Sequence, residues 1–365
     1  MDTELLYLTA LLKVQGIGPV TARNLISYSG GVEAVFKQRP AALRKIPEVG
    51  PKTPIERIVK GETIGQAEEE LKQVQAIGAR ALSFLQPDYP DALRTLSNAP
   101  LLLFALGTLD LNQHIGLSIV GTRTPTDYGK TQTRRFARHF AEGGFNVVSG
   151  LAFGIDIEAH KETLAAGGIT TAVVAHGLDK VYPSQHKTHA KQIAENGGAI
   201  LTEFFLNTPA DAINFPSRNR IIAGLSKATI IIEAAETGGS ILTASLANDH
   251  HREVFALPGP VHSERSQGCH KLIREHKAAL ITSPEEVLDE LNLVYNGRTA
   301  EAAQNIPLLS AEELEIYHHL SLDGILLDDL ALRTNRTISH LMSTLLAMEF
   351  KGAVRQLPGR KFVRA

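Results

Sequence analysis

The stretch "NFPSRNRIIAGLSKATIIIEAAETGGSILTA", residues 214–244, combines two arginines, a fully apolar run and a glycine turn. It predicts a short apolar helix opened by Arg218 to Arg220, a buried strand, and a second helix after the Thr-Gly-Gly-Ser turn. Guanidinium groups bind anions, and a glycine turn lets the backbone at a helix N-terminus approach an anion closely. The stretch therefore predicts an anion site at one end of a buried strand.

Similar apolar runs alternate with segments of helix length on both sides of this stretch. Runs that are apolar throughout are typical of parallel strands covered by helices on both faces. We therefore predict a doubly wound α/β domain with a mostly parallel sheet over about residues 100–290. The expected strands are "GLSIVGT", "FNVVSGL", "TTAVVAHG", "AILTEF", "ATIIIEA", "EVFALPG" and "AALITS".

The region before this domain, residues 1–85, has a helical pattern. Its turn "GIGPVTARNLI", residues 16–26, is similar to a helix-hairpin-helix, whose backbone N–H groups hold a nucleic-acid phosphate. A helical interaction module without DNA contact explains the same pattern, so both interpretations stay open. The following stretch "LQPDYPDALRTLSNAPLLLFALG", residues 85–107, predicts an extended, proline-punctuated connection.

The region after the domain begins with a small, polar stretch at residues 292–306, which predicts a linker. Residues 307–365 predict three helices and a β-hairpin around Pro358-Gly359, the pattern of a winged helix. Ser310 and Glu313 form a capping box, and the third helix is expected to turn Ile338, Leu341, Leu345 and Met348 inward. Acidic residues crowd the first two helices and basic residues follow Glu349, so DNA contact and protein contact both stay open here.

Composition excludes several classes of protein. The 365 residues are 43% hydrophobic and 21% charged with a net charge of −2, which argues against a broadly basic nucleic-acid coat but allows a local basic cleft. The single cysteine, Cys269, rules out a disulfide framework and is typical of a reducing, cytoplasmic environment. No apolar run is long enough to cross a bilayer, and the acidic start is not a secretory signal, so no membrane association is expected.

Ligands of open parallel sheets bind beyond the carboxyl ends of the strands, so a site is expected in the segments that come after the strands. These segments are rich in glycine, hydroxyl groups or basic side chains, which favours phosphate as the ligand. The candidate binding residues are Gly121, Thr122, Arg123, Ser149, Gly150, Gly154, Lys187, Phe215, Arg218, Asn219, Arg220, Gly238, Gly239 and Ser240.

Catalytic and cofactor motifs are missing. The sequence has no Gly-x-Gly-x-x-Gly dinucleotide motif, no P-loop and no nucleophile elbow. The pairs His250-His251 and His186/His189 do not have the spacing of metal ligands and are expected at the surface. Asp156 is expected to cap or fix a turn, and Glu203, Glu233 and Glu236 are expected to cap or support rather than catalyse. We therefore predict no catalytic residues, no cofactor and no metal.

Taken together, the ordered motifs "SIVGTR", "VVSGLAFGIDIEAHKETL", "GLDKVYP", "NFPSRNRIIAGLS", "ETGGSILTA", "FALPGP" and "GCHKLI" resemble the DNA-processing protein A family, also called DprA or Smf. The resemblance implies an extended Rossmann domain over residues 86–291, an N-terminal helical domain of the SAM or helix-hairpin-helix type, and a C-terminal winged helix. It further implies a non-enzymatic, cytoplasmic homodimer that binds and protects single-stranded DNA and loads RecA recombinase onto it during natural transformation.

The resemblance also implies roles for individual residues. Gly121, Thr122 and Arg123 match a motif that grips phosphate, Phe215 is expected against a base, and Arg218 and Arg220 are expected in the basic groove. Gly238, Gly239 and Ser240 are expected to complete the pocket. Relatives often carry a lysine where this chain has Ala212 and a basic residue where it has Ser184, with Lys187 the nearest substitute. Fewer groove charges predict weaker, more salt-sensitive binding.

Two alternatives remain. A nucleoside-monophosphate phosphoribohydrolase has a similar Rossmann core, but its Pro-Gly-Gly-x-Gly-Thr signature is missing from "ETGGSILTAS". The second alternative is a protein-interaction scaffold whose Rossmann crevice no longer binds a ligand. Loss of single-strand binding on removal of Arg123 or Arg218 separates that scaffold from a DNA-binding protein.

Overall fold

The computed structural model describes residues 2–295, 309–320, 325–334, 336–357 and 359–364. The chain divides into two compact units, residues 1–111 with 116–295, and residues 112–115 with 296–365. The predicted linker therefore lies outside the described residues from position 296 onward, as does Pro358 of the predicted hairpin. Each unit is described by itself below.

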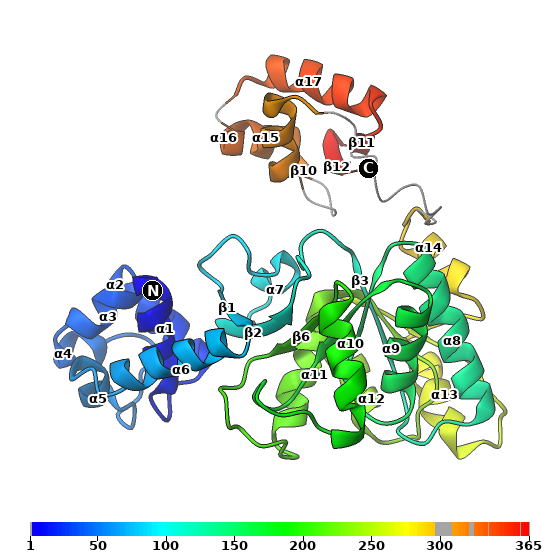
Figure 1. Cartoon of the computed structure of the whole chain (residues 1–365), viewed down its shortest axis with the longest axis horizontal. Coiled ribbons are helices and arrows are strands. Elements are labelled where there is room, and N and C mark those ends of the chain that lie inside the picture. The colour runs from blue at the N-terminus through cyan, green and yellow to red at the C-terminus, as the bar shows by residue number, and fades with distance from the viewer. Residues whose placement is uncertain (1, 296–308, 321–324, 335, 358, 365) are drawn as a thin grey trace. The chain divides into compact units, whose positions relative to one another are not determined.

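Short helices form the N-terminal part of the first unit (Figure 1). The first helix begins after Asp2, whose carboxylate accepts a hydrogen bond from the backbone N–H of Glu4 at 2.9 Å. The second begins with proline directly after the turn at Gly18, a favourable first position for proline in a helix. The helices are α1 (Thr3–Lys13), α2 (Pro19–Ser29), α3 (Val32–Lys37), α4 (Pro40–Leu43), α5 (Ile55–Val59) and α6 (Ile64–Ala76).

A nine-stranded sheet, counted over the described residues, forms the centre of this unit, in the order β1-β2-β6-β5-β4-β3-β7-β8-β9. All strands that lie between β6 and β9 in this order, and these two strands themselves, run parallel to one another. β1 and β2 extend the sheet beyond β6 in antiparallel pairing. The strands are β1 (Ala79–Ser83), β2 (Leu102–Gly107), β3 (Gly116–Val120), β4 (Asn146–Ser149), β5 (Ile169–Val173), β6 (Ala199–Thr202), β7 (Ser226–Ile231), β8 (Glu253–Ala256) and β9 (Ala279–Leu280).

Helices cover both faces of the sheet. Right-handed crossovers between parallel strands place α8, α9 and α10 on one face, because they connect β3, β4, β5 and β6 in one direction. The chain then reverses, so α11, α12 and α13 cover the other face. The helices are α7 (Asp91–Arg94), α8 (Asp127–Glu142), α9 (Ile155–Ala165), α10 (Lys187–Glu195), α11 (Asn214–Leu225), α12 (Gly239–Asp249), α13 (Gln267–Arg274) and α14 (Pro284–Glu290), with 3-10 turns at Ser184–His186 and Glu264–Ser266.

This arrangement confirms the predicted doubly wound, mostly parallel sheet, and each of the seven expected strands is present. The prediction for residues 85–107 was incomplete, because this stretch contains α7 and β2 rather than only an extended connection. β2 pairs with β1, and together they extend the sheet beyond β6.

The helical region and the sheet share one hydrophobic core. Buried side chains form a continuous cluster from Leu8 and Leu11 of α1 to Val174, directly after β5, and Ile200 of β6. Glu70 of α6 links the two regions through polar contacts. Its carboxylate forms an ion pair with Lys13 of α1 at 2.8 Å and accepts a hydrogen bond from the backbone N–H of Leu206, after β6, at 2.7 Å. The two regions therefore pack as parts of one unit.

The second unit contains a small three-stranded sheet in the order β10-β12-β11 and the helices that pack on it. The predicted capping box is confirmed: the N–H of Glu313 donates to the Ser310 hydroxyl and the Glu313 carboxylate accepts the N–H of Ser310. Leu341, Leu345 and Met348 are buried as predicted, but Ile338 is 45% exposed, so its predicted inward position was wrong. The elements are α15 (Ala311–His319), β10 (Ile325–Leu326), α16 (Leu327–Thr334), α17 (Ile338–Phe350), β11 (Val354–Leu357) and β12 (Lys361–Arg364).

The described residues contain neither a membrane-spanning helix nor a metal-binding cluster. None of their helices has both the length and the apolar character that crossing a membrane requires. No group of three or more histidine, cysteine, aspartate or glutamate side chains among them is arranged to hold a metal ion.

Candidate functional site

A pocket of about 260 Å³ lies at the point where the sheet reverses direction, between the carboxyl ends of β3 and β7. Strands to one side of β3 follow in the order β4, β5, β6, and the crossover through α11 then returns the chain to the other side. Such a reversal leaves a crevice that the loops of both halves can line. The lining residues are Val120, Gly121, Thr122, Arg123, Ala152, Asp156, Phe215, Arg218, Asn219, Ile222, Ala235, Thr237, Gly238, Gly239, Ser240 and Thr243.

The loop after β3 is held from two sides. The backbone N–H of Thr122 donates to the carbonyl oxygen of Glu233 after β7 at 2.7 Å, and the Thr122 carbonyl accepts the N–H of Ile155 at 3.2 Å. Gly154 makes this close approach possible: its φ is +82°, and a Cβ there would lie 2.2 Å from the Thr122 carbonyl oxygen. The neighbouring Arg123 side chain is thereby presented from a fixed backbone.

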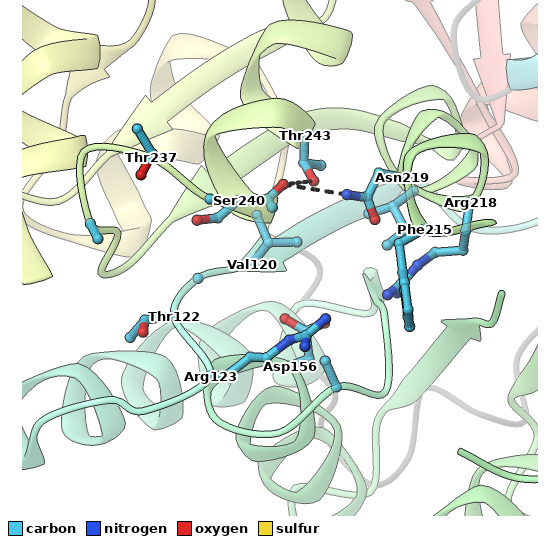
Figure 2. A pocket seen from close by; sticks show the side chains of 16 residues that line it. Val120, Thr122, Arg123, Asp156, Phe215, Arg218, Asn219, Thr237, Ser240 and Thr243 are labelled. Atoms are coloured by element: carbon cyan, nitrogen blue, oxygen red, sulfur yellow. Dashed lines mark hydrogen bonds between the residues drawn. The ribbon is translucent and has the colours of Figure 1, made fainter. Parts of the chain in front are cut away.

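Arg123 and the first turns of α11 meet around one aromatic ring. The Cζ atoms of Arg123 and Arg218 lie 5.4 Å and 5.6 Å from the ring centroid of Phe215, within the range of a cation–π interaction. Figure 2 shows Arg123 reaching from the loop after β3, and Phe215 and Arg218 from α11, toward the same space. The arrangement combines two cations with a flat apolar surface.

Arg218 is the buried cation of the pocket, with 4% of its surface exposed. One guanidinium nitrogen, Nη1, donates to the carbonyl oxygen of Val173 at the end of β5 at 3.1 Å, and Nε has no hydrogen-bond partner among the described residues. Burial lowers the pKa of Arg218 to about 10, against the attraction of Asp156, so the side chain keeps its charge at neutral pH. A buried cation with an unused donor has the chemistry to bind an anion.

Asp156, in the first turn of α9, faces this cation. Burial raises the pKa of its carboxyl group, while Arg218 and the backbone N–H groups of Ala152 and Gly150 act in the opposite direction. The sequence predicted a capping or turn-fixing residue. The structure adds a second role, as a charged neighbour of Arg218 that lines the pocket.

The first turn of α12 forms the opposite wall. Its N-cap is Gly238, which has no side chain to cap the helix, so the first N–H groups stay available for a ligand. Two side chains fix the turn through the Gly239 carbonyl: Asn219 Nδ2 donates to it at 3.3 Å and Thr243 Oγ1 at 2.9 Å (Figure 2). The predicted residues Gly238, Gly239 and Ser240 thus lie in the same pocket as Arg123 and Phe215.

Five of the predicted site residues lie outside the lining. Ser149 is buried and donates to the carbonyl oxygen of Ile119 at 2.7 Å. Lys187 is exposed at the start of α10. Arg220 pairs with Glu203, and both side chains are nearly buried. The remaining two, Gly150 and Gly154, lie behind the lining and allow Arg218 and the loop after β3 to pack closely.

The glutamates expected to cap or support have ordinary partners. Glu233 is buried and binds the N-terminus of α8, where its Oε2 accepts the N–H of Thr126 at 2.9 Å. Glu236 lies 3.6 Å from Lys271. The expectation that the histidines are at the surface was wrong for His186, which is buried and bonded through Nδ1 to the Leu151 carbonyl at 2.7 Å.

Several lining residues were not predicted. Thr237 directly precedes a predicted glycine and Ile222 lies one helical turn after Arg218, so proximity in the sequence could have suggested both. Thr243 could have been found in the same way, because it lies one turn after Gly239, whose carbonyl it binds. Ala152 carries no chemical signal.

Comparisons with protein families assign three parts of the chain. Residues 80–292 match the family model described as DNA recombination-mediator protein A. Residues 300–360 match the DprA winged helix domain, and residues 8–61 match a SAM-like helix-hairpin-helix tandem.

Similar proteins span most of the chain. Protein Smf of Synechocystis is 33% identical over 100% of this chain and 99% of its own length. Protein Smf of Escherichia coli is 36% identical over 74% of each chain.

Two solved structures are similar as well. The X-ray structure of DNA processing protein A from Streptococcus pneumoniae aligns with a TM-score of 0.68 and 30% identity, covering 78% of this chain and 97% of that one. A Helicobacter pylori DNA processing protein A, whose structure is described as revealing a single-stranded DNA binding mode, aligns with a TM-score of 0.53 and 30% identity, covering 59% of this chain and 95% of that one.

Proposed function

The chain belongs to the DNA recombination-mediator protein A family, also called DprA or Smf, and we propose that its pocket binds single-stranded DNA. The observation that carries the proposal is the meeting of Arg123, Arg218 and Phe215 beside the uncapped first turn of α12. Cations and free N–H groups bind phosphates, and an aromatic ring stacks on a base of any sequence. Together they suit a strand whose bases are unpaired.

The shape of the site favours a single strand over a duplex. A reader of double-stranded DNA inserts a helix or a β-ribbon into a groove, whereas this pocket is a recess between loop ends. A single strand can place one phosphate and one base into such a recess. Binding through phosphates and stacking is independent of sequence, as a DNA-processing protein requires.

A binding role rather than catalysis is supported by the acidic residues. Asp156 is the one carboxylate among the described residues that line the pocket, and it is buried beside Arg218. Two glutamates near the crevice are engaged by other groups, Glu233 at the N-terminus of α8 and Glu203 with Arg220. We therefore propose a DNA-binding protein without enzymatic activity. Release of a free base from a nucleoside monophosphate by the purified protein would contradict this.

The finer parts of the proposal follow from family membership. We propose that the protein acts in the cytoplasm as a homodimer, protects incoming single strands and loads RecA onto them during natural transformation. A strand-exchange assay with RecA and a single strand coated by single-stranded DNA-binding protein tests the loading step. Faster strand exchange in the presence of this chain is the expected result.

The binding proposal is tested by fluorescence anisotropy with a labelled poly-dT oligonucleotide and the matching duplex over a range of salt concentrations. We expect tight, salt-dependent binding to the single strand and weak binding to the duplex. Arg123→Ala should weaken single-strand binding by about 10- to 100-fold, the value of a charge-assisted hydrogen bond, and reduce the salt slope by about 1.

The matched control is Arg135→Ala, which removes an equally charged, exposed side chain from α8, where it lies 3.7 Å from Glu285. Its affinity for the single strand should stay close to that of the parent chain. Equal losses in both variants would mean that only the net charge of the protein matters, which would contradict a defined pocket.

A further inference from the structure

Two aromatic side chains beside the pocket are exposed to solvent although the loops that carry them are well packed. Tyr182, in the loop after β5, is 50% exposed, and Phe153, in the loop after β4, is 44% exposed. Neither lines the pocket. Both loops follow carboxyl ends of strands, so they lie along the same edge of the sheet as the pocket.

Both residues connect directly to the pocket. The ring centroid of Tyr182 lies 6.4 Å from that of Phe215, which lines it. Phe153 directly precedes Gly154, where a Cβ would lie 2.6 Å from the carbonyl carbon of Arg123. One exposed ring therefore neighbours Phe215, and the other is carried by the loop that packs against the backbone of Arg123.

The structure anchors the backbone at Tyr182 and packs the ring of Phe153 against a buried side chain. The backbone N–H of Tyr182 donates to Nε2 of the buried His176 at 3.2 Å, while Nδ1 of that imidazole donates to the Gly177 carbonyl oxygen at 2.9 Å. The ring of Phe153 lies 4.9 Å from the buried imidazole of His186 in an edge-on arrangement. A ligand that stacks on a ring whose backbone or side chain is already held in place loses less free energy to ordering of the protein.

A cation accompanies this surface. Lys187 follows His186 at the start of α10, is exposed, and has no ion-pair partner among the described side chains. Ser184, three residues before Lys187, and Ala212, three residues before Phe215, are uncharged. The surface around Tyr182 and Phe153 therefore offers two exposed aromatic rings and one nearby exposed lysine, Lys187.

We infer that Tyr182 and Phe153 are stacking platforms for bases that neighbour the nucleotide in the pocket, with Lys187 beside them for the backbone. The inference rests on the proposed function and names the ligand more closely: a single strand of several nucleotides whose bases, and not only its phosphates, are bound. Base stacking then contributes affinity at a place where Ala212 and Ser184 supply no charge.

The experiment compares the full-length chain with Tyr182→Ala, Phe153→Ala and the double variant. Each is titrated with a labelled dT oligonucleotide of about 12 nucleotides and with a backbone of the same length made of abasic sites. Each single variant should lose about 5- to 100-fold in affinity for the dT strand, the value of one stacked base, with little change for the abasic backbone. Tyr182→Phe and Phe153→Tyr keep an aromatic ring and should bind as the parent does.

Tyr28→Ala is the matched control, because Tyr28 is 64% exposed on α2, away from the sheet edge. It should leave both affinities unchanged. Thermal melting of every variant separates loss of binding from loss of folding.

The outcomes distinguish the inference from the function on which it rests. Unchanged dT affinity in the double variant would overturn the platforms while leaving the pocket proposal intact, and so would equal losses for the dT strand and the abasic backbone. A parent chain that binds no dT strand at any salt concentration would instead overturn the proposed function.

Discussion

Arg218 and Asp156 approach each other in the space that Gly150 leaves by having no side chain. A Cβ at Gly150 would lie 1.6 Å from Nη1 of Arg218 and 2.6 Å from Oδ2 of Asp156. Both charged groups are buried, so neither can move aside into solvent. The position of the buried cation therefore depends on a glycine that does not line the pocket.

Gly150→Ala should damage both stability and binding. The added methyl group must displace the Arg218 guanidinium, and overpacking of this kind lowers the free energy of unfolding by about 1–3 kcal/mol. Affinity for a dT oligonucleotide should fall by about 10-fold or more, because a charged hydrogen bond to phosphate is lost. Thermal melting and fluorescence anisotropy measure the two effects. Gly65→Ala is the control, since a Cβ there meets nothing within 4 Å; equal melting of the two variants would contradict the packing argument.

Arg220 should matter for stability and not for DNA contact. It pairs with Glu203, and removing one partner of a buried ion pair costs about 3–5 kcal/mol because the other charge stays buried. Arg220→Met should therefore lower the free energy of unfolding, measured in urea, while the folded fraction binds single strands normally. Combining it with Glu203→Leu should recover most of the lost stability. A stable Arg220→Met protein with weak binding would place this side chain in the DNA site instead.

His160, a fully buried residue of α9, should make the protein less stable in acid. Burial lowers the pKa of His160 from 6.5 to about 3, so between these values the unfolded chain takes up a proton that the folded chain refuses. This contribution to stability is fully present above pH 6.5 and is lost as the pH falls. At pH 5 the loss amounts to ~2 kcal/mol, since each pH unit is worth about 1.4 kcal/mol.

The measurement compares urea unfolding of the parent chain and His160→Gln at pH 7.5 and pH 5. The difference in free energy of unfolding between them should shrink by about 2 kcal/mol at the lower pH, because only the parent carries this titration. If the difference in free energy of unfolding between the parent and His160→Gln did not depend on pH, His160 would have the same pKa in the folded and the unfolded chain, which contradicts the prediction.

Removal of residues 296–365, the larger segment of the second unit, should leave single-strand binding intact. Every pocket residue lies between Val120 and Thr243. The exposed side of α17 carries Ile338, Met342, Leu346 and Phe350 at 39–85% exposure, and this helix contains no lysine or arginine with which to hold phosphate. A chain of residues 1–295 should bind a dT oligonucleotide within about twofold of the full chain, because the phosphate-binding groups are retained. A tenfold loss by anisotropy would show that the winged helix contributes.

The fold was predictable from the sequence because buried parallel strands are apolar throughout and each is followed by a segment of helix length. β1 and β2 were not, since they are short antiparallel additions separated by prolines, and β2, although apolar, is followed by β3 without a helix between them. The predicted division of the chain at residues 85, 291 and 306 stays a prediction. β1, which pairs with the sheet, falls within the part expected to be helical.

For the site, glycines and arginines at strand ends indicated the edge of the sheet at which the pocket lies, because backbone N–H groups and cations can meet an anion there. Arg218 and Arg220 were assigned together, yet residues two positions apart on a helix point about 200° away from each other. Only one of them can face the crevice, a signal that was present in the sequence. The partnership of Arg218 with Asp156 joins residues far apart in the chain, so only the tertiary structure shows it.

The core that runs from α1 to the sheet has a mechanical consequence. Since α6 is tied to the segment after β6 through Glu70, the N-terminal helices cannot swing on a tether. The turn at Gly16–Gly18 therefore stays at a constant offset from the pocket. A DNA strand that contacted both the turn and the pocket would need a minimum length to reach from one to the other. The affinity for oligonucleotides would then rise in a step once their length exceeds this minimum.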